Sequence, residues 1–445
     1  MTTPTLTSPR RSAFRVLAPI VAGGFLLFVA GAVVADFRLP PYHLLFQRAF
    51  AYAHAVIERH ATERGAAAEV KITGPTGRVS IPATAAAFDG YTFLTFGPSR
   101  RSTARLIAMD GSVVHEWHKD LRAIWPDPPQ RARPSPDSAI SWRYAHLFAN
   151  GDIITTIKSS GDTPDGYGIV KLDKDSNVIW AIPENFHHHF SIAPDGRIFG
   201  IEHNWRNTRV RPVDGLPSLP PKVLEDRLVV ISTDGKVLSR TSLLELMAAP
   251  EHRDLLTSTI FKPYHTNNWD PLHPNDAEYV PASFARMHPE MMKAGDVLLS
   301  FRDLDALAIY DPAANKITRT IRGPWVRQHD PDLLPNGHII LFDNRGDDIP
   351  DIPGGSTRIL EIDPETTNVL WDYHGTAAHP FRSIRSGGEQ RLPNGNTLIS
   401  EDETGRVFEV TRDGTIVWEY RDTSTHHATR VAKDWITFTP QHPRQ

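Results

Sequence analysis

The sequence contains no cysteine, and this absence excludes disulfide bonds, cysteine-ligated zinc and thiol nucleophiles. The chain also lacks a large excess of either positive or negative charge. The chain has 48 Lys and Arg against 52 Asp and Glu, a net charge of −4, and no sustained basic stripe. Because binding to a nucleic-acid backbone depends on such a stripe, nucleic acid is not expected as a partner.

The rest of the composition fits a globular protein. With 445 residues, 40% of them hydrophobic and 22% charged, the chain can bury a normal core. The length suits about three average domains or one large β architecture. Two residue types are abundant. The 37 prolines indicate many turns and loops, and the 21 histidines provide candidates for a functional site.

A long uncharged run lies near the N-terminus. Residues 16–35 carry no charge, and twenty helical residues at about 1.5 Å each match a hydrocarbon core of roughly 30 Å. Three arginines at positions 10–15 precede the run, which predicts that the N-terminus is cytoplasmic. We therefore expect a cytoplasmic segment over 1–15, a single-pass inner-membrane helix or signal anchor over 16–36, and a main domain that is periplasmic or extracellular.

Two further expectations concern this end of the chain. A cleaved signal peptide is the alternative to an anchor, because Val33 and Ala35 suit a signal peptidase. The main domain is exported in either case. Apolar residues at helical spacing then predict a stalk helix over 40–65. We expect this helix to be a spacer that packs on the main domain or lies on the bilayer.

From about residue 80 onward, a short β-type run recurs after a turn or small loop. The six copies are Val113–Trp117, Val178–Ile182, Val237–Thr241, Ile317–Ile321, Val369–Tyr373 and Ile416–Tyr420. Another β run, in most cases ending near an Asp, precedes each copy, so that each pair reads as a hairpin.

A second repeated unit precedes these hairpins. It is an Asn-Gly or Asp-Gly turn that leads into an apolar strand, seen at Asn150, Asp195, Asn336 and Asn394. Such dipeptides suit two-residue turns that need positive φ. Four strands repeated six times predict an all-β fold, a six-bladed β-propeller over residues 80–440.

The first blade lacks an innermost strand, and an unpaired β run lies near the C-terminus at Ala428–Val431. We predict that this C-terminal segment supplies the missing strand and closes the ring, which hides otherwise exposed strand edges. The segments Trp125–Pro136 and Leu243–Pro271 are the main insertions, and we expect both on one face.

The position of the histidines relative to the turns indicates a shared site. The first strand of each propeller blade lines the central channel, so equivalent positions converge. Counting back seven residues from each turn Asn or Asp gives Arg143, His188, His329 and Gly387. The corresponding stretch of the fourth blade contains His273 and Asn275, and the strand that follows it ends at Arg302. We expect His188, His273, His329, Asn275 and Arg302 to meet in one funnel.

This set of side chains suits a tetrahedral oxyanion. Arg offers a planar fork of donors, Asn offers an amide donor, and a neutral His offers a nucleophilic nitrogen. Glycoside hydrolysis is disfavoured because no convergent carboxylate pair is evident. The run His187–His189 could instead hold zinc or copper, with only Asp276 and Asp330 as nearby carboxylates. Arg143 could bind an anionic substrate or pair with a channel Asp.

The order of these motifs resembles the bacterial arylsulfotransferases, over roughly residues 80 to 435. The motifs are His187-His188-x-Phe190, Asp270-x-Leu272-His273-x-Asn275, Ser300-x-Arg302, Gln328-His329-Asp330, Leu334-Pro-Asn-Gly337 and Leu341-Phe-Asp-Asn344. The resemblance implies a six-bladed propeller that acts outside the cytoplasm. It also implies transfer of a sulfuryl group from a phenolic sulfate ester to a phenol, without the donor PAPS, through a sulfohistidine.

Roles follow from the resemblance by position. His329 is the implied nucleophile, and the other catalytic residues around the sulfuryl group are His188, His273, Asn275 and Arg302. A neighbouring His would protonate the leaving phenolate and deprotonate the acceptor. The substrate-binding residues that we expect are Arg143, His187 and Asn344. No cofactor and no metal are expected.

The sequence departs from the family pattern in two places. An insertion around Ala282–Met292 separates Asn275 from Arg302, and Asp303 stands where the family tends to have His. Two other functions remain open from the sequence. One is a non-catalytic, membrane-anchored propeller that serves as a binding or assembly module, and the other is a His-ligated metalloenzyme.

Overall fold

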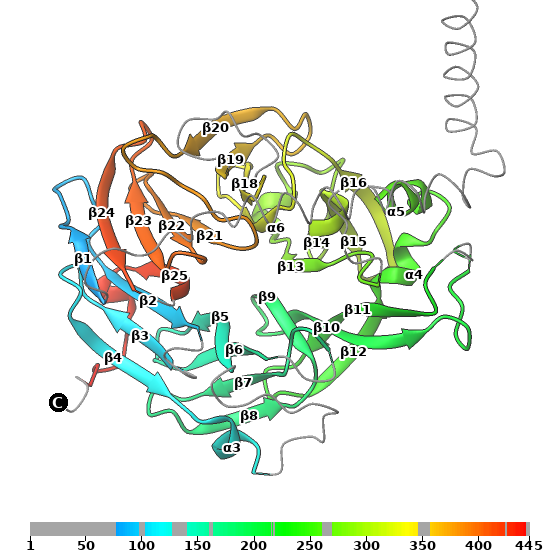
Figure 1. Ribbon diagram of the computed structural model, residues 1–445, viewed down its shortest axis with the longest axis horizontal. Helices are drawn as coiled ribbons and strands as arrows, with labels where there is room; N and C mark the ends of the chain where they lie inside the picture. Colours follow the sequence, from blue (N-terminus) through cyan, green and yellow to red (C-terminus); the bar gives the residue numbers. More distant parts are fainter. Residues whose placement is uncertain are drawn as a thin grey trace, which may run out of the picture. The chain divides into compact units, whose positions relative to one another are not determined.

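The structure is a computed structural model of the chain, and the fold is drawn in Figure 1. It describes residues 77–97, 103–126, 140–159, 163–214, 216, 219–259, 269–345, 357–422 and 425–441. The predicted membrane segment over 16–36 and the predicted stalk over 40–65 lie outside these residues, as does most of the insertion after Trp125. Among the residues described, no helix is both long and apolar enough to cross a membrane.

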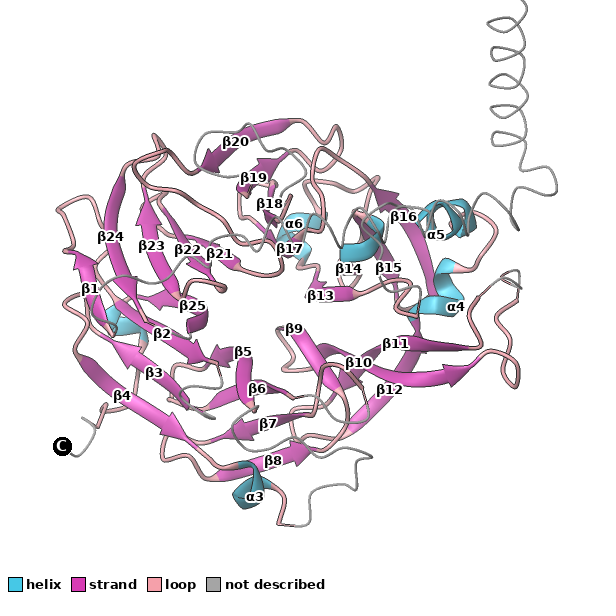
Figure 2. Ribbon diagram, viewed as in Figure 1, coloured by secondary structure: helices cyan, strands magenta, loops and turns pink. Residues whose placement is uncertain are grey.

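Six antiparallel sheets stand around a centre (Figures 1 and 2), which confirms the six-bladed all-β propeller. The strands of each blade are given from the centre outward. Blade 1 contains β25 (Thr425–Val431), β2 (Tyr91–Phe96), β3 (Thr103–Ile107) and β4 (Val113–His118), and blade 2 contains β5 (Ser141–Leu147), β6 (Ile153–Lys158), β7 (Gly168–Leu172) and β8 (Val178–Ile182). Blade 3 contains β9 (Phe186–Ile192), β10 (Ile198–Asn207), β11 (Lys222–Ile231) and β12 (Val237–Ser242), and blade 4 contains β13 (Pro274–Tyr279), β14 (Val297–Phe301), β15 (Ala306–Asp311) and β16 (Lys316–Ile321). Blade 5 contains β17 (His329–Leu333), β18 (Ile339–Asp343), β19 (Arg358–Ile362) and β20 (Val369–His374), and blade 6 contains β21 (Gly388–Arg391), β22 (Thr397–Glu401), β23 (Arg406–Val410), β24 (Ile416–Arg421) and β1 (Arg78–Ile81).

The described helices are short and connect strands. They are α3 (Leu121–Ile124), α4 (Leu243–Met247), α5 (Arg253–Thr259), α6 (Ala282–Ala285) and the 3-10 turns η3 (Arg302–Leu304) and η5 (Lys433–Trp435). α4 and α5 lie in the predicted insertion after β12. The six recurrent β-type runs of the sequence form the fourth strand of each blade.

The ring is closed at two seams. β25 pairs with β2, from Tyr91 opposite Val431 to Phe96 opposite Thr425, so the predicted C-terminal closure is confirmed. The second closure was not predicted from the sequence. β1 pairs with β24 and makes blade 6 a five-stranded sheet. Since both ends of the described chain complete a sheet, neither seam exposes a long unpaired edge.

The Asn-Gly and Asp-Gly turns have a different geometry from the expected two-residue turns. Gly151 has a φ of 86°, while Asn150 does not have positive φ. The Gly151 N–H donates to the Phe148 carbonyl, and the Phe148 N–H donates to the Asp152 carbonyl. A type I turn followed by a left-handed glycine therefore connects the strands. Only the glycine needs the left-handed conformation.

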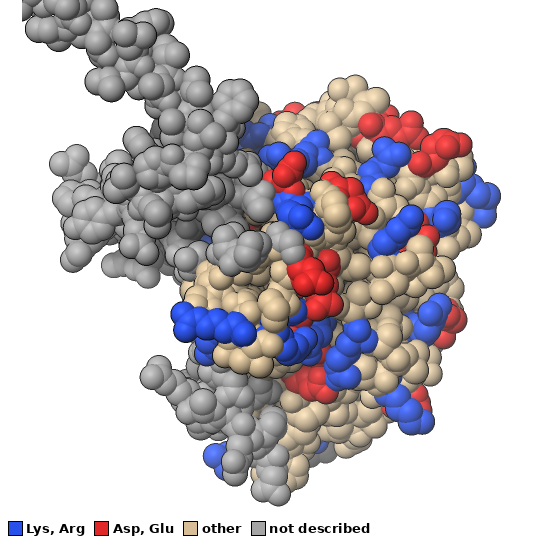
Figure 3. All heavy atoms as spheres, turned by 90° about the vertical axis from the view of Figure 1, so that its right-hand side faces the viewer, with Lys and Arg blue, Asp and Glu red and all other residues tan. Residues whose placement is uncertain are grey.

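The core lies between neighbouring sheets. One buried cluster joins blades 1 and 2 through Phe93, Trp117, Trp142 and Ile153, and comparable clusters fill the other gaps between blades in the described part of the chain. Because this burial surrounds the channel, the inner strands are held at fixed positions. On the face in Figure 3, basic and acidic side chains alternate in small groups, as the small net charge suggests.

Candidate active site

The inner strands of blades 2 to 5 are irregular where the sequence places the site. In each of these blades the pairing register between the first and second strands shifts at one point. The shift lies between Trp142 and Ala145 in β5, and in β9 it lies opposite Phe199–Ile201 of β10. In β13 it lies between Pro274 and Asp276, and in β17 between His329 and Asp332. Such bulges bend a strand and re-aim a side chain. The bulges therefore direct side chains of four adjacent blades away from regular strand positions.

Backbone strain also occurs at these positions. φ is 56° at His188, 46° at His273 and 52° at Asp330, which follows His329. A left-handed conformation costs a residue other than glycine about 1–3 kcal/mol and persists only where the surroundings enforce it. Strained residues on three neighbouring blades indicate a functional site.

The three predicted histidines meet. The ring centroid of His188 lies 5.3 Å from that of His273 and 6.2 Å from that of His329. His188, rather than His187, therefore faces the other two rings. Burial, reinforced by the neighbouring His187 and His273, holds the pKa of His188 well below its usual value, so this imidazole is neutral.

The hydrogen bonds of His329 determine which ring nitrogen is free. Nδ1 lies 2.7 Å from Oδ1 of Asn344 and 3.1 Å from the carbonyl oxygen of Arg327. The Asn344 amide nitrogen donates to Ser383 O and Ser386 O, which orients Oδ1 toward the ring. Since both contacts of Nδ1 are acceptors, Nδ1 carries the proton and Nε2 holds a lone pair.

Nε2 of His329 is buried and has no hydrogen-bond partner within the described residues. Burial, followed by the positive charge of Arg302, keeps the pKa of His329 well below its usual value. The ring is therefore neutral, and its free nitrogen points away from the Asn344 contact. These are the properties of a nucleophilic imidazole.

His273 has the opposite electrostatics. Its Nδ1 lies 2.6 Å from Oδ2 of Asp270. Burial disfavours the charged ring, but the Asp270 carboxylate outweighs this effect and the pKa of His273 is raised. Burial also opposes ionisation of Asp270, yet its contacts with His273 hold the Asp270 pKa at about 2. The pair can therefore hold a proton beside the neutral rings of His188 and His329.

Arg302 reaches the site despite the insertion. Its backbone N–H donates to the carbonyl of His273 over 3.1 Å, and Pro274 pairs with Phe301. The insertion loops out between β13 and β14 and contains α6, so the pairing at the inner end of the blade is retained. The Arg302 guanidinium donates to Asp303 over 2.5 Å. Asp303 thus offsets part of the charge that Arg302 brings.

The family model of the arylsulfotransferases (ASST) matches residues 145–423, well over half of the 445 residues. The chain belongs to the arylsulfotransferase family. The matched range runs from β5 to just beyond β24 and includes His188, His273, Arg302 and His329. The family supports sulfotransfer as the type of reaction, and the resemblance seen in the sequence is confirmed.

No curated protein matches the sequence of this arylsulfotransferase-family chain. Among solved structures, a protein of unknown function from Bacteroides caccae is 11% identical, with a TM-score of 0.47, over 77% of this chain and 99% of its own. A streptogramin B lyase is 12% identical (TM-score 0.40; 78% and 86% covered), and virginiamycin B lyase from Staphylococcus aureus is 11% identical (TM-score 0.34; 62% and 69% covered).

Two predicted site residues of this arylsulfotransferase-family chain contact protein groups beside His329. The Asn275 amide donates one N–H to Gln328 O over 2.7 Å, which ties the β13 bulge to the strand of the nucleophile candidate. Asn344 is fully buried and lies behind His329, where it orients the ring. Both amides thus fix the position of His329.

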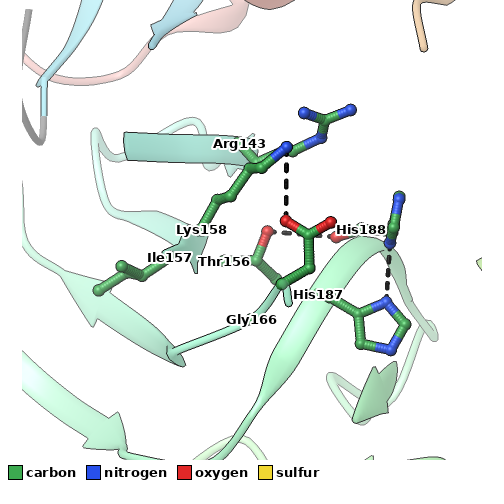
Figure 4. A pocket seen from close by; sticks show the side chains of 8 residues that line it. Arg143, Thr156, Ile157, Lys158, Gly166, His187 and His188 are labelled. Carbon is green, nitrogen blue, oxygen red and sulfur yellow. Dashed lines mark hydrogen bonds and ion pairs between the residues drawn. The ribbon is translucent and has the colours of Figure 1, made fainter. Parts of the chain in front are cut away.

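Arg143 and His187 border a small hollow of about 10 Å³ (Figure 4). Arg143 pairs with Asp402 over 3.3 Å. Of the two roles expected for Arg143, pairing with an Asp is therefore the one that the contact shows. Lys158 reaches into the same hollow and pairs with Asp165. Each of the two cations is thus paired with a carboxylate, and the charge of Arg143 contributes to the lowered pKa of His188.

The expectation that no pair of carboxylates converges on the site is wrong. A cavity of about 170 Å³ is lined by Pro164, Asp165, His187, His188, His203, Asp226, Trp269, Asp270 and His273. Burial, aided by the nearby Asp270 charge, raises the pKa of Asp226 to about 8. The sequence did not indicate Asp165, His203 or Asp226. Asp270 was part of the motif Asp270-x-Leu272-His273, and its position three residues before His273 is the sequence feature that could have placed it in the site.

Proposed function

We propose that the chain transfers a sulfuryl group from a phenolic sulfate ester to a second phenol, without PAPS, through a sulfohistidine on His329. In the first half-reaction, Nε2 of His329 attacks the sulfur, an N–S bond forms, and the S–O bond to the leaving phenol breaks. The leaving phenolate takes a proton from the His273 imidazolium.

The second half-reaction restores both histidines. His273 takes the proton of the acceptor phenol, and the phenol oxygen attacks the sulfur as the N–S bond breaks. His329 returns to its neutral form and His273 to its protonated form. Each proton and bond is thus accounted for within one donor and one acceptor, and no nucleotide is required.

The free Nε2 of His329 is the observation that carries this proposal. A buried imidazole with its other nitrogen bound to Asn344 can attack only through Nε2. Arg302 supports the transition state, because sulfuryl transfer is a loose displacement like phosphoryl transfer and collects charge on the equatorial oxygens. One of its five N–H groups contacts Asp303, which leaves others for those oxygens.

Mass spectrometry tests the proposal directly. Full-length protein mixed with an aryl sulfate in the absence of acceptor, then quenched with base, should yield a peptide that contains His329 and carries one added sulfuryl group. The label should disappear when a phenol is added before the quench. Steady donor turnover without a modified histidine, or with the label on His188, would contradict the assignment of the nucleophile.

The pH dependence of donor turnover should reflect the protonation state of His273. Burial lowers the pKa of His273, Asp270 and Asp303 raise it, and Arg302 lowers it. Because the first half-reaction needs the imidazolium, kcat/KM for the donor should fall as pH rises through that pKa. In Asp270→Asn the largest charge that raises the pKa is lost, so the decline should begin at lower pH.

A pH–rate profile of the donor half-reaction measures this shift. Asp270→Glu is the matched control, because it keeps a carboxylate beside the ring and should leave the alkaline decline near its original position. An unchanged profile in Asp270→Asn would show that His273 is not the acid.

A further inference from the structure

Behind His188, blade 3 presents a second set of ionisable side chains on one face. His203 of β10 and Asp226 of β11 are direct partners across the two strands. His187 of β9 pairs with Ile201, two positions from His203, so it points to the same face. The rings of His187 and His203 lie 4.2 Å apart between centroids. The proposed sulfotransfer uses none of these three side chains.

The three side chains are buried without ordinary hydrogen bonds among them. His187 is 6% exposed, His203 4% and Asp226 1%. Nε2 of His187 lies 3.3 Å from Oδ1 of Asp226, and Nδ1 of His203 lies 3.7 Å from the same oxygen. Both oxygens of Asp226 and Nε2 of His187 have no hydrogen-bond partner among the described residues. A carboxylate in this position is costly unless a cation compensates it.

The tautomer of His203 strengthens the case for a cation. Its Nε2 lies 2.6 Å from the backbone carbonyl oxygen of Asp165. A carbonyl only accepts, so Nε2 carries the proton, and the Nδ1 of the neutral ring turns a lone pair toward Asp226. Whenever Asp226 is ionised, two acceptors therefore face each other. An imidazole whose far nitrogen donates to a carbonyl is also the usual arrangement of a metal-binding histidine.

We propose that Nε2 of His187, Nδ1 of His203 and the Asp226 carboxylate bind one divalent transition-metal ion of the zinc class. The three ligand atoms lie within 4.8 Å of one another. Two atoms bound to the same ion at about 2.0–2.1 Å with tetrahedral angles are roughly 3.3 Å apart, which matches the His187–Asp226 separation of 3.3 Å. Two imidazoles and one carboxylate favour zinc over magnesium or calcium, which prefer oxygen ligands.

The metal would leave a coordination position open toward the cavity of about 170 Å³, which the three ligands also line. The site is coupled to the sulfotransfer site through one hydrogen bond. A metal on Nε2 of His187 keeps the proton on Nδ1, which lies 2.7 Å from Nδ1 of His188. His188 then accepts at Nδ1 and carries its own proton on Nε2. The ion therefore fixes which nitrogen of His188 can donate to a substrate.

A second group of similar composition provides the matched control. His189, Asp330 and His427 also lie within 4.8 Å of one another. There, Asp330 pairs with His189 over 2.5 Å and accepts a hydrogen bond from the Glu389 backbone N–H. This carboxylate is already compensated, and we expect no metal in that group.

The experiment is a zinc titration of the full-length protein after treatment with a chelator. Calorimetry should show one Zn²⁺ bound per chain, and Co²⁺ in its place should give the visible absorption bands of a low-coordinate nitrogen and oxygen site. His203→Gln and Asp226→Asn should each weaken zinc binding by about 100-fold or more, while His427→Gln should bind like the original protein.

Thermal unfolding of the unmodified protein gives a readout that does not depend on variants that fold. Because only the folded chain holds the ion, Zn²⁺ should raise its Tm and Mg²⁺ should not. The proposal is overturned if zinc neither binds nor raises the Tm, or if both ligand variants bind zinc like the unmodified chain. Loss of binding in His427→Gln alone would also overturn it, because the ion would then lie in the other group.

Discussion

Replacing His329 by alanine should lower turnover of an aryl sulfate by about 10⁴-fold or more, since the change removes the proposed nucleophile itself. The loss should affect kcat and should persist at saturating donor and acceptor. Release of the phenol from a chromogenic phenyl sulfate measures it. The folded state should survive, because Asn344 keeps its two hydrogen bonds to Ser383 and Ser386.

His338→Ala is the matched control for this variant. His338 lies in the turn between β17 and β18, nine residues from His329, and pairs with Glu361 near the surface. Its removal should leave turnover close to that of the unmodified protein. If His329→Ala turned over donor at an unchanged rate, His329 would be excluded as the nucleophile. A binding or assembly module would become the better account only if the unmodified protein transferred no sulfate at all.

Replacing His273 by glutamine should lower donor turnover by about 10²–10⁴-fold, and the size of the loss should depend on the leaving phenol. A phenol of high pKa needs the proton of His273 as the S–O bond breaks. An electron-poor phenol leaves without that help and should show the smaller loss. A series of ring-substituted phenyl sulfates, plotted as log kcat/KM against the pKa of the phenol, should become steeper in the variant.

Asp270→Asn gives the internal comparison for this series. It keeps the His273 ring and removes only the carboxylate that raises its pKa. Measured at a pH on the flat part of the profile, the slope of this variant should therefore lie between those of the unmodified protein and His273→Gln. An equal loss for every donor in His273→Gln would mean that the residue positions substrate and does not transfer the proton.

The sequence predicted the blades well because each fourth strand keeps a strand pattern after a turn. Runs such as Val178–Ile182 match the observed strand bounds. β1 was missed because its four residues, Arg78–Ile81, are short and only half-buried, and their pairing with β24 joins positions more than 300 residues apart. The turn type was missed because Asn-Gly suits both a two-residue turn and a turn with a bulge.

His188 and His329 could be found from sequence because each stands seven residues before a turn, and His273 was found in the corresponding stretch of the fourth blade. The side chains around them could not. His203 lies on the second strand of a blade and Asp226 on the third, and only the pairing of β10 with β11 brings them together behind His188. The tautomer of His329 depends on Asn344 and, through it, on Ser383 and Ser386, which come from a later loop.

The pairing of β25 with β2 has a consequence for biosynthesis. His427 on β25 contacts Asp330, which directly follows the nucleophile candidate. A growing polypeptide can form blades 2 to 5 long before residues 425–431 have left the ribosome, yet the wall of the reaction centre beside Asp330 is still missing. Products that terminate before residue 425 thus lack an intact centre, and activity can be acquired only after residues 425–431 have been synthesised.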